Sequence, residues 1–178
     1  MKRGEKGFTL IEVAVVVFIM ALIASGATMT IAQVLGITKD SNNRTTAIRQ
    51  VQSAGYWISQ DSLMAQSVTT VDDPETLEPE FITLSWTAWE NSDVHKVVYT
   101  FEDMPTGLKK LKRQHLVYDI NGLEIENDMM YIAQNIIDSA SFSVEDGVWI
   151  LSIGARSGTK TENREYEIIP RVEGYRLI

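Results

Sequence analysis

Residues 6–20 read KGFTLIEVAVVVFIM, and the structure expected for the N-terminal part of the chain follows from this stretch. After Gly7 the sequence becomes apolar at once, and residues 8–37 contain no Lys, Arg, Asp or Pro. A helix over residues 8–37 rises about 45 Å, which exceeds the roughly 30 Å of hydrocarbon in a bilayer. The one charged side chain in it, Glu12, costs roughly 2.5–3.5 kcal/mol at membrane depth and therefore needs an explanation.

The charges before this stretch predict its orientation in the membrane. Residues 1–7 hold Lys2, Arg3 and Lys6 against Glu5, so the end of the chain before the apolar run is basic. A basic segment next to a membrane helix stays on the cytoplasmic side. The run is longer than the apolar core of a secretory signal, and no A-x-A-like site follows it, so a conventional removable signal peptide is not expected.

The composition of the whole chain excludes several classes of function. Its 178 residues carry 16 Lys and Arg against 24 Asp and Glu, a net charge of −8. An acidic surface argues against a broad phosphate-binding face, so nucleic acid is not the expected partner. The absence of cysteine excludes a disulfide framework, a thiolate zinc site and a cysteine nucleophile.

The helical pattern continues beyond the membrane-length run. Residues 39–66 are polar, but an apolar stripe recurs every three to four positions, and it consists of Ile48, Val51, Gly55, Ile58 and Leu63. A stripe of this width suits packing against a sheet. Because the first proline is Pro74, we predict one helix over about residues 8–67, embedded in the membrane in its first half.

The remainder of the chain alternates apolar and polar residues as strands do. The predicted strands are 81–89, 95–102, 108–118, two strands flanking Asp146-Gly147, and 164–172, in which Pro170 favours an edge position or a strand end. Residues 123–139 are ambiguous between loop, short helix and strand. The predicted fold class is therefore α+β, a long N-terminal helix packed on an antiparallel β-sheet.

These patterns divide the chain into four segments. They are a leader peptide (1–7), the transmembrane half of the helix (8–37), its soluble amphipathic half (38–70) and the sheet domain (71–178).

The stretch KGFTLIEV resembles the processing site of type IV pilins and the related pseudopilins. The resemblance implies that a membrane peptidase cuts after Gly7 and methylates the new N-terminal residue, Phe8. It also implies that Glu12 acts as a carboxylate for assembly. This role has a physical basis, because a free α-amino group has a pKa of about 7.7–8.0 and can neutralise the Glu12 of a neighbouring subunit at low dielectric.

A second resemblance concerns the subtype. Residues 47–68 and 164–171 resemble minor pilin or J-type pseudopilin sequences, and the chain has neither the cysteine pair nor the helix proline common in major pilins. The resemblance implies a structural subunit of a type IV pilus or a type II secretion-like filament. Its implied partners are the prepilin peptidase/methyltransferase, other major and minor pilin subunits, and the inner-membrane assembly platform.

The same resemblance implies a location. Before assembly the chain is expected to cross the cytoplasmic membrane once, with the C-terminal domain outside. After assembly it is expected in a cell-surface or periplasmic filament.

Other chemistries find no support in the sequence. There is no G-x-S-x-G, H-E-x-x-H or Gly-rich phosphate loop, so we expect neither an enzyme nor a cofactor. The acidic stretch 119–128 lacks the spacing of a calcium loop, so no metal site is assigned. The basic cluster at 108–115 has no interleaved aromatic residues, and we do not expect it to contact DNA.

Two alternatives remain open at this point. A tip adhesin or DNA-uptake receptor subunit would need an exposed aromatic or basic patch, and Trp89, close to a turn, is the tryptophan expected to be exposed. The tryptophans at 57, 86 and 149 are expected to fill the core. A plain single-pass membrane-anchored protein would not be cut after Gly7.

Overall fold

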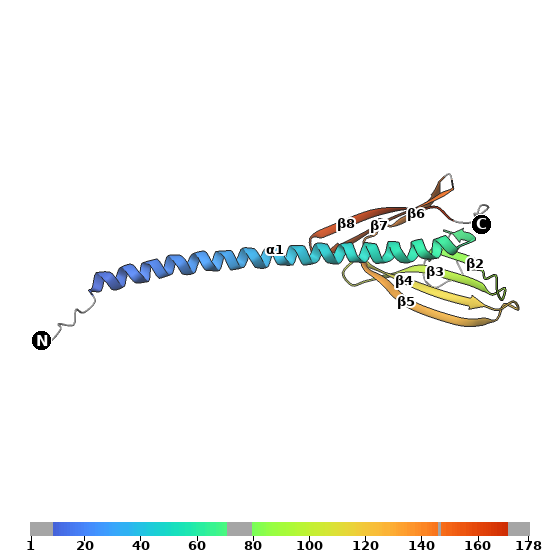
Figure 1. The fold of residues 1–178 in the computed structure, drawn as a ribbon, viewed down its shortest axis with the longest axis horizontal. Helices are drawn as coiled ribbons and strands as arrows, with labels where there is room; N and C mark the ends of the chain where they lie inside the picture. Colours follow the sequence, from blue (N-terminus) through green and yellow to red (C-terminus); the bar gives the residue numbers. More distant parts are fainter. Residues whose placement is uncertain (1–8, 71–79, 146, 171–178) are drawn as a thin grey trace. The chain divides into compact units, whose positions relative to one another are not determined.

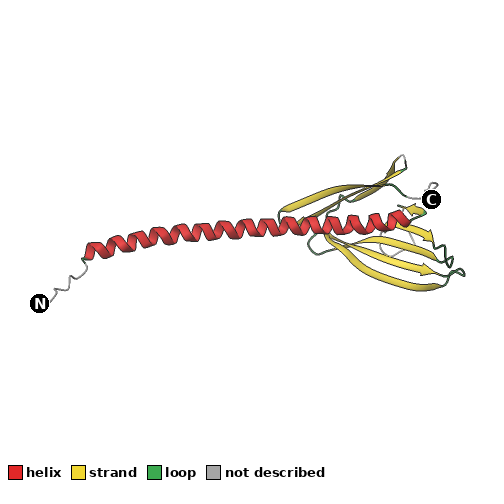
Figure 2. Ribbon diagram, viewed as in Figure 1, coloured by secondary structure: helices red, strands yellow, loops and turns green. Residues whose placement is uncertain are grey.

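The computed structural model describes residues 9–70, 80–145 and 147–170. These residues form one long helix, α1 (Leu10–Met64), followed by strands that all pair antiparallel. The predicted α+β class is confirmed (Figure 2). The strands are β1 (Ser67–Thr69), β2 (Glu80–Thr87), β3 (Val94–Asp103), β4 (Lys109–Tyr118), β5 (Glu124–Ile136), β6 (Ser141–Glu145), β7 (Val148–Ser157) and β8 (Lys160–Ile168).

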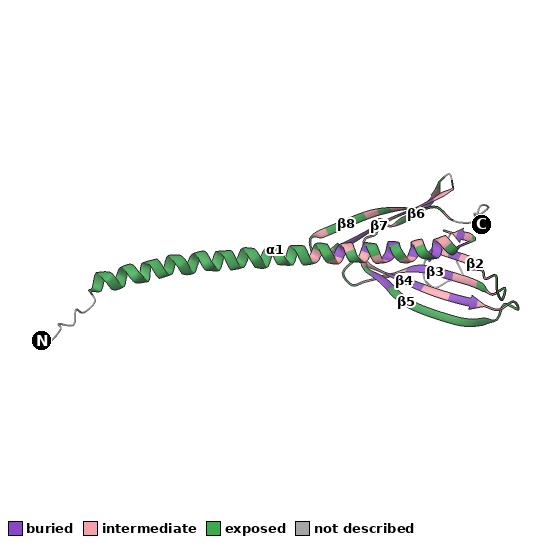
Figure 3. Ribbon diagram, in the orientation of Figure 1, coloured by how far each residue is buried: buried purple, intermediate pink, exposed green. Residues whose placement is uncertain are grey.

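The chain divides into two compact units between Asn42 and Asn43. In the first unit, the described part of α1 is exposed over most of its surface, including its large apolar side chains (Figure 3). Among the described residues, α1 is the one helix long and apolar enough to cross a membrane. An apolar surface of this extent needs lipid or other helices to cover it.

In the second unit, α1 fills a gap in the sheet. The strand order is β1-β2-β3-β4-β5-β7-β6, with β8 on β7, but β5 and β7 pair only at Ile136 and Ala155. Next to that pair, the Ser53 hydroxyl donates to the Ile132 carbonyl (2.6 Å), and the Gln134 N–H donates to the Gln50 side-chain oxygen (2.6 Å). Helix side chains thus satisfy backbone groups of β5 where no strand pairs with it. Figure 1 shows α1 passing between β2–β5 and β6–β8.

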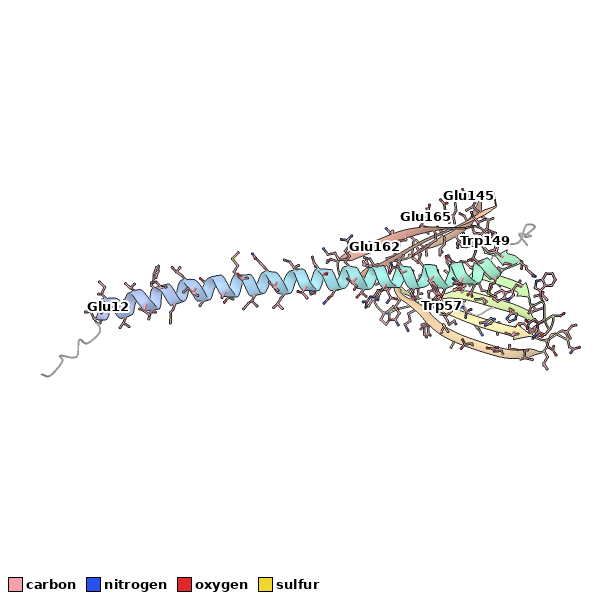
Figure 4. The ribbon with its side chains drawn as sticks, viewed as in Figure 1. Glu12, Trp57, Glu145, Trp149, Glu162 and Glu165 are labelled. Atoms are coloured by element: carbon pink, nitrogen blue, oxygen red, sulfur yellow. The ribbon has the colours of Figure 1, made fainter. Side chains whose placement is uncertain are left out.

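The buried face of the helix confirms the predicted stripe in part. Val51, Gly55 and Ile58 are buried, whereas Ile48 and Leu63 are half-buried. The strands supply the other wall of the core, and its largest fully buried side chains include Trp149, Tyr99 and Leu84. Figure 4 labels Trp57 and Trp149 on opposite sides of α1; Trp149 is fully buried in the core, whereas Trp57 is half-buried and packs against it.

Gly55 has a packing role that the sequence did not reveal. A Cβ atom at this position would lie 2.2 Å from Cζ of Tyr166 on β8. The Tyr166 hydroxyl also donates to the Val51 carbonyl (3.2 Å), which holds the ring against the helix. The glycine therefore allows β8 to approach α1 closely.

Several predicted boundaries differ from the structure. The helix ends at Met64, before the expected residue 67, because residues 67–69 pair with β2 as β1. The last strand begins at Lys160, earlier than the expected residue 164, because Gly158 (φ +55°) makes the turn from β7. It ends at Ile168, before the expected residue 172, and Pro170 lies beyond the strand end; residues 171 and 172 are outside the described residues.

Two other predictions concern hairpins and the ambiguous segment. The hairpin around Asp146-Gly147 is confirmed, since Glu145 pairs with Val148 and Gly147 has φ +84°; Asp146 lies outside the described residues. The ambiguous segment 123–139 contains a long strand, β5. Most of the first half of β5 is exposed, which removes the alternation that would have identified it as a strand.

Candidate functional site

Glu12 closes a capping box at the start of α1. Its Oε2 accepts hydrogen bonds from both the backbone N–H (2.9 Å) and the hydroxyl (2.9 Å) of Thr9. In return, the Glu12 N–H lies 3.4 Å from the Thr9 Oγ1. Thr9 is thus the N-cap and Glu12 the third helical residue, the reciprocal arrangement typical of Ser/Thr-x-x-Glu. Figure 4 labels Glu12 at this end of the helix.

This arrangement explains how a carboxylate is accommodated at the start of an apolar helix. The first turn of a helix has N–H groups without intrahelical partners, and the helix dipole favours negative charge there. The carboxylate therefore has partners within its own chain. The T-x-x-E pattern of Thr9 and Glu12 signals this capping role in the sequence, although the expectations for Glu12 above concern only its charge.

The capping box lies on one side of the predicted cut. Gly7 and Phe8, the predicted cleavage and methylation residues, lie outside the described residues. Thr9 and Glu12 both follow Phe8, so a cut after Gly7 leaves the two capping residues in the same chain. A glutamine at position 12 preserves the capping box, because Gln fills this position as Glu does.

A second polar cluster joins the C-terminal end of α1 to the sheet. Asp61, in the last turns of α1, accepts hydrogen bonds from Arg113 on β4 through Nε (2.7 Å) and Nη2 (2.9 Å). The hydroxyl of Tyr99 on β3 donates to the same carboxylate. Asp61 and Arg113 are only 5% and 7% exposed, and the guanidinium lies 5.0 Å from the Trp57 ring centroid.

The protonation of this cluster follows from its burial. Burial raises the pKa of the Tyr99 hydroxyl, and the neighbouring Asp61 charge and hydrogen bond raise it further. Burial alone would lower the pKa of Arg113, but the hydrogen bond and charge of Asp61 outweigh it and the pKa is raised. Tyr99 therefore remains a neutral donor and Arg113 a cation, and the pair acts as a structural tie.

Beside this tie, aromatic rings form one wall of an open cavity of about 750 Å³. His95 Nδ1 and His115 Nε2 lie 3.0 Å apart, and the His95 ring stacks on Trp86 with a centroid distance of 5.2 Å. Trp89 lies at the cavity and is 98% exposed, which confirms the prediction for this tryptophan. A wall of aromatic rings, next to an ion pair whose charges neutralise each other, is suited to contact with another molecule.

The basic cluster of β4 is largely occupied by acidic neighbours. Lys109 lies 2.7 Å from Asp138, and Lys110 lies 3.5 Å from Glu102. Arg113 is bound to Asp61 as described above. These cations are already paired within the chain, so the basic strand is not a free phosphate-binding stripe.

The described residues contain no group of three or more metal-ligating side chains. Within the acidic stretch 119–128, Asp119 instead accepts backbone N–H groups of Asn121 (2.9 Å) and Leu123 (2.8 Å). These bonds lower the pKa of the Asp119 carboxyl, and Leu123 makes the largest contribution. Asp119 is thus a turn-forming residue.

Comparison with known proteins identifies the N-terminal region. Residues 2–28 match the family described as "Prokaryotic N-terminal methylation motif". No curated protein and no solved structure matches the chain. The motif belongs to a structural, non-enzymatic class of proteins, in agreement with the prediction that the chain is not an enzyme.

The motif and the fold agree with each other. The matched residues include the beginning of α1, and the chain continues as a long helix packed on an antiparallel sheet, as in pilins. The motif implies processing by prepilin peptidase and assembly with other pilins. Together with the hydrophobic helix, it indicates membrane anchoring before assembly into an extracellular filament. Over residues 2–28 the chain is similar to proteins that carry the prokaryotic N-terminal methylation motif, as type IV pilin-like proteins do.

Proposed function

We propose that the chain is a minor pilin or pseudopilin, a structural subunit of a type IV pilus or type II secretion-like filament. It is cut after Gly7, methylated at Phe8 and assembled through α1. The observation that carries the proposal is the methylation motif at residues 2–28, which includes the beginning of an exposed apolar helix of membrane-spanning length.

The proposed segments follow from this role. Residues 1–7 are the leader, 8–37 cross the membrane, 38–70 continue outside it and 71–178 form the sheet domain. In a filament, the exposed apolar surface of α1 is covered by the equivalent helices of neighbouring subunits. The absence of cysteine and of a helix proline favours a minor rather than a major subunit.

In this proposal Glu12 has two successive partners. In the single chain its carboxylate caps its own helix through Thr9. In the filament it neutralises the Phe8 amine of a neighbouring subunit, at a depth where neither charge is stable alone. Both roles use the carboxylate, but only the second needs its negative charge.

The test separates these two roles. Glu12→Gln keeps the capping box and removes the charge, whereas Thr9→Val removes the cap and keeps the charge. We expect both variants to be cut by prepilin peptidase. Glu12→Gln should be absent from isolated filaments, and Thr9→Val should be present in them at a reduced amount.

The readout is the amount of subunit in sheared filaments relative to the amount in membranes, measured by immunoblot. Incorporation of Glu12→Gln at the wild-type level would contradict the amine–carboxylate pairing. Loss of Thr9→Val as complete as that of Glu12→Gln would show that the cap, and not the charge, is required.

A further inference from the structure

Two hairpin turns lie side by side at one end of the sheet. Residues 88–93 connect β2 to β3, and residues 119–123 connect β4 to β5. They are neighbours because Val94, the first residue of β3, pairs with Tyr118, the last residue of β4 (Figure 1). The C-terminal end of α1 reaches the same region, since Met64 and Trp89 line the same cavity.

This end of the sheet exposes large apolar side chains. Trp89 is 98% exposed and Ile120 is 75% exposed, and neither turn buries them. We call the whole group the hairpin-tip surface, and it consists of Met64, Trp89, Val94, Ile120, Leu123 and Ile125. Single exposed apolar residues are ordinary, but a group gathered on adjacent turns marks an interaction site.

Both turns have an internally hydrogen-bonded backbone. In the second turn, the Asp119 carboxylate accepts the N–H groups of Asn121 and Leu123, and Gly122 has φ +79°. In the first turn, the Ala88 N–H donates to the Asp93 carbonyl (2.8 Å). A surface that is ordered before binding loses less conformational entropy when a partner docks.

The charge around the surface selects the partner. Residues 86–95 and 117–131 contain no Lys or Arg. Their acidic residues are Glu90, Asp93, Asp119, Glu124, Glu126 and Asp128. An anionic membrane, or a second copy of this surface, would place negative charge against negative charge. A protein with an apolar patch surrounded by Lys and Arg is complementary.

We propose that the hairpin-tip surface docks a sister subunit that presents an apolar patch with a basic rim. The proposal rests on the proposed function in one respect, namely that the partner is another subunit carrying the methylation motif. Trp89 and Ile120 are the anchors, and the acidic rim orients the partner. The surface is formed by the sheet unit, so it acts independently of Glu12.

The first experiment locates the contact. A photo-crosslinking residue is placed at position 89 of the full-length chain in membranes, together with the sister subunits that carry the methylation motif. The control is the same residue at Glu165, which is exposed on β8. We expect a crosslink to one sister subunit from position 89 and none from position 165. Crosslinking from position 165 alone, or from neither position, would overturn the proposal.

The second experiment measures the affinity of the detergent-solubilised, full-length proteins. We expect Trp89→Ser with Ile120→Ser to weaken binding of that sister subunit about tenfold or more. Ile169→Ser, a matched change of an exposed residue outside the surface, should bind like the wild type. Equal binding by all three proteins would overturn the proposal. Unchanged unfolding transitions exclude loss of fold as the cause.

Charge reversal distinguishes three possible occupants of the surface: the sister subunit, an anionic membrane and a second copy of this chain. Glu90→Lys with Glu124→Lys should weaken binding of the sister subunit. Stronger binding of this variant to vesicles containing phosphatidylserine, with no effect on the sister subunit, would identify a membrane surface instead. Stronger association of this variant with the wild-type chain, again with no effect on the sister subunit, would identify self-association. Either of these two results overturns the proposal.

Failure of the docking proposal is distinguishable from failure of the proposed function. If the surface does not dock a sister subunit, the hairpin-tip variants still enter filaments and Glu12→Gln still does not. If the chain is not a filament subunit, both kinds of variant leave filaments unchanged and the chain is absent from them.

Discussion

Removing Asp61 is expected to be one of the most destabilising single changes in the sheet unit. Asp61→Ala leaves the Arg113 guanidinium buried with its carboxylate partner gone and deprives Tyr99 of its acceptor. Breaking a buried ion pair from one side costs about 3–5 kcal/mol. This is a large share of the roughly 5–15 kcal/mol that stabilises an ordinary domain. At about 4 °C per kcal/mol for a unit of this size, Tm should fall by roughly 12–20 °C.

The assay is urea unfolding of the full-length chain in detergent micelles, followed by tryptophan fluorescence. Trp149 is fully buried, so its emission reports on the sheet unit. Asp138→Ala is the matched control, because Asp138 also lies 2.7 Å from its cation, Lys109, but its side chain is 84% exposed. A surface ion pair contributes at most about 1 kcal/mol, so the control should be close to wild type.

A double variant checks the cause of the loss. Arg113→Met in the Asp61→Ala background removes the unpaired charge, and we expect it to recover part of the lost stability. An Asp61→Ala chain as stable as Asp138→Ala would refute the reasoning. So would a double variant in which the two losses simply add, because the two residues would then act independently.

Two further predictions concern packing and pH. Gly55→Ala should destabilise the sheet unit by about 1–3 kcal/mol, because the overlap of the new methyl group with Tyr166 outweighs the roughly 1 kcal/mol by which alanine favours a helix. Gly36→Ala is the control, since a Cβ atom there has open space, and it should not destabilise the chain. Equal urea midpoints for the two variants would contradict the packing role of Gly55. Burial, together with the charges of Arg113 and His95, lowers the pKa of His115 below 6.5 in the folded chain. As the pH falls, the unfolded chain therefore binds a proton at this histidine before the folded chain does. Stability should therefore be complete above pH 6.5 and fall as the pH drops below it, and urea midpoints of a His115→Gln chain should show a weaker dependence.

The sequence predicts the elements that have a strong period. The apolar run and the stripe at Val51, Gly55 and Ile58 predict α1, because both patterns repeat along one continuous helix. The first half of β5 could not be recognised from a period in the sequence. It pairs with β4, but most of its side chains are exposed on both faces, and its sequence has no alternation to detect.

The candidate sites also differ in how far they can be predicted from the sequence. Thr9 and Glu12 are three residues apart, so the sequence alone contains the signal of their capping box. Asp61 and Arg113 are separated by 52 residues and Asp61 and Tyr99 by 38. Only the register of β3 and β4 against the end of α1 brings these three together, and a single sequence does not specify that register. The grouping of the two turns in the hairpin-tip surface depends on the same strand pairing.

The most direct test of the account is the mass of the N-terminal peptide of the chain isolated from its native membranes. Cleavage after Gly7 and methylation of the new terminus predict a peptide that begins at Phe8 and is one methyl group heavier than the unmodified sequence. A peptide that retains Met1 or Lys2, from cells in which prepilin peptidase processes its other substrates, would contradict the account.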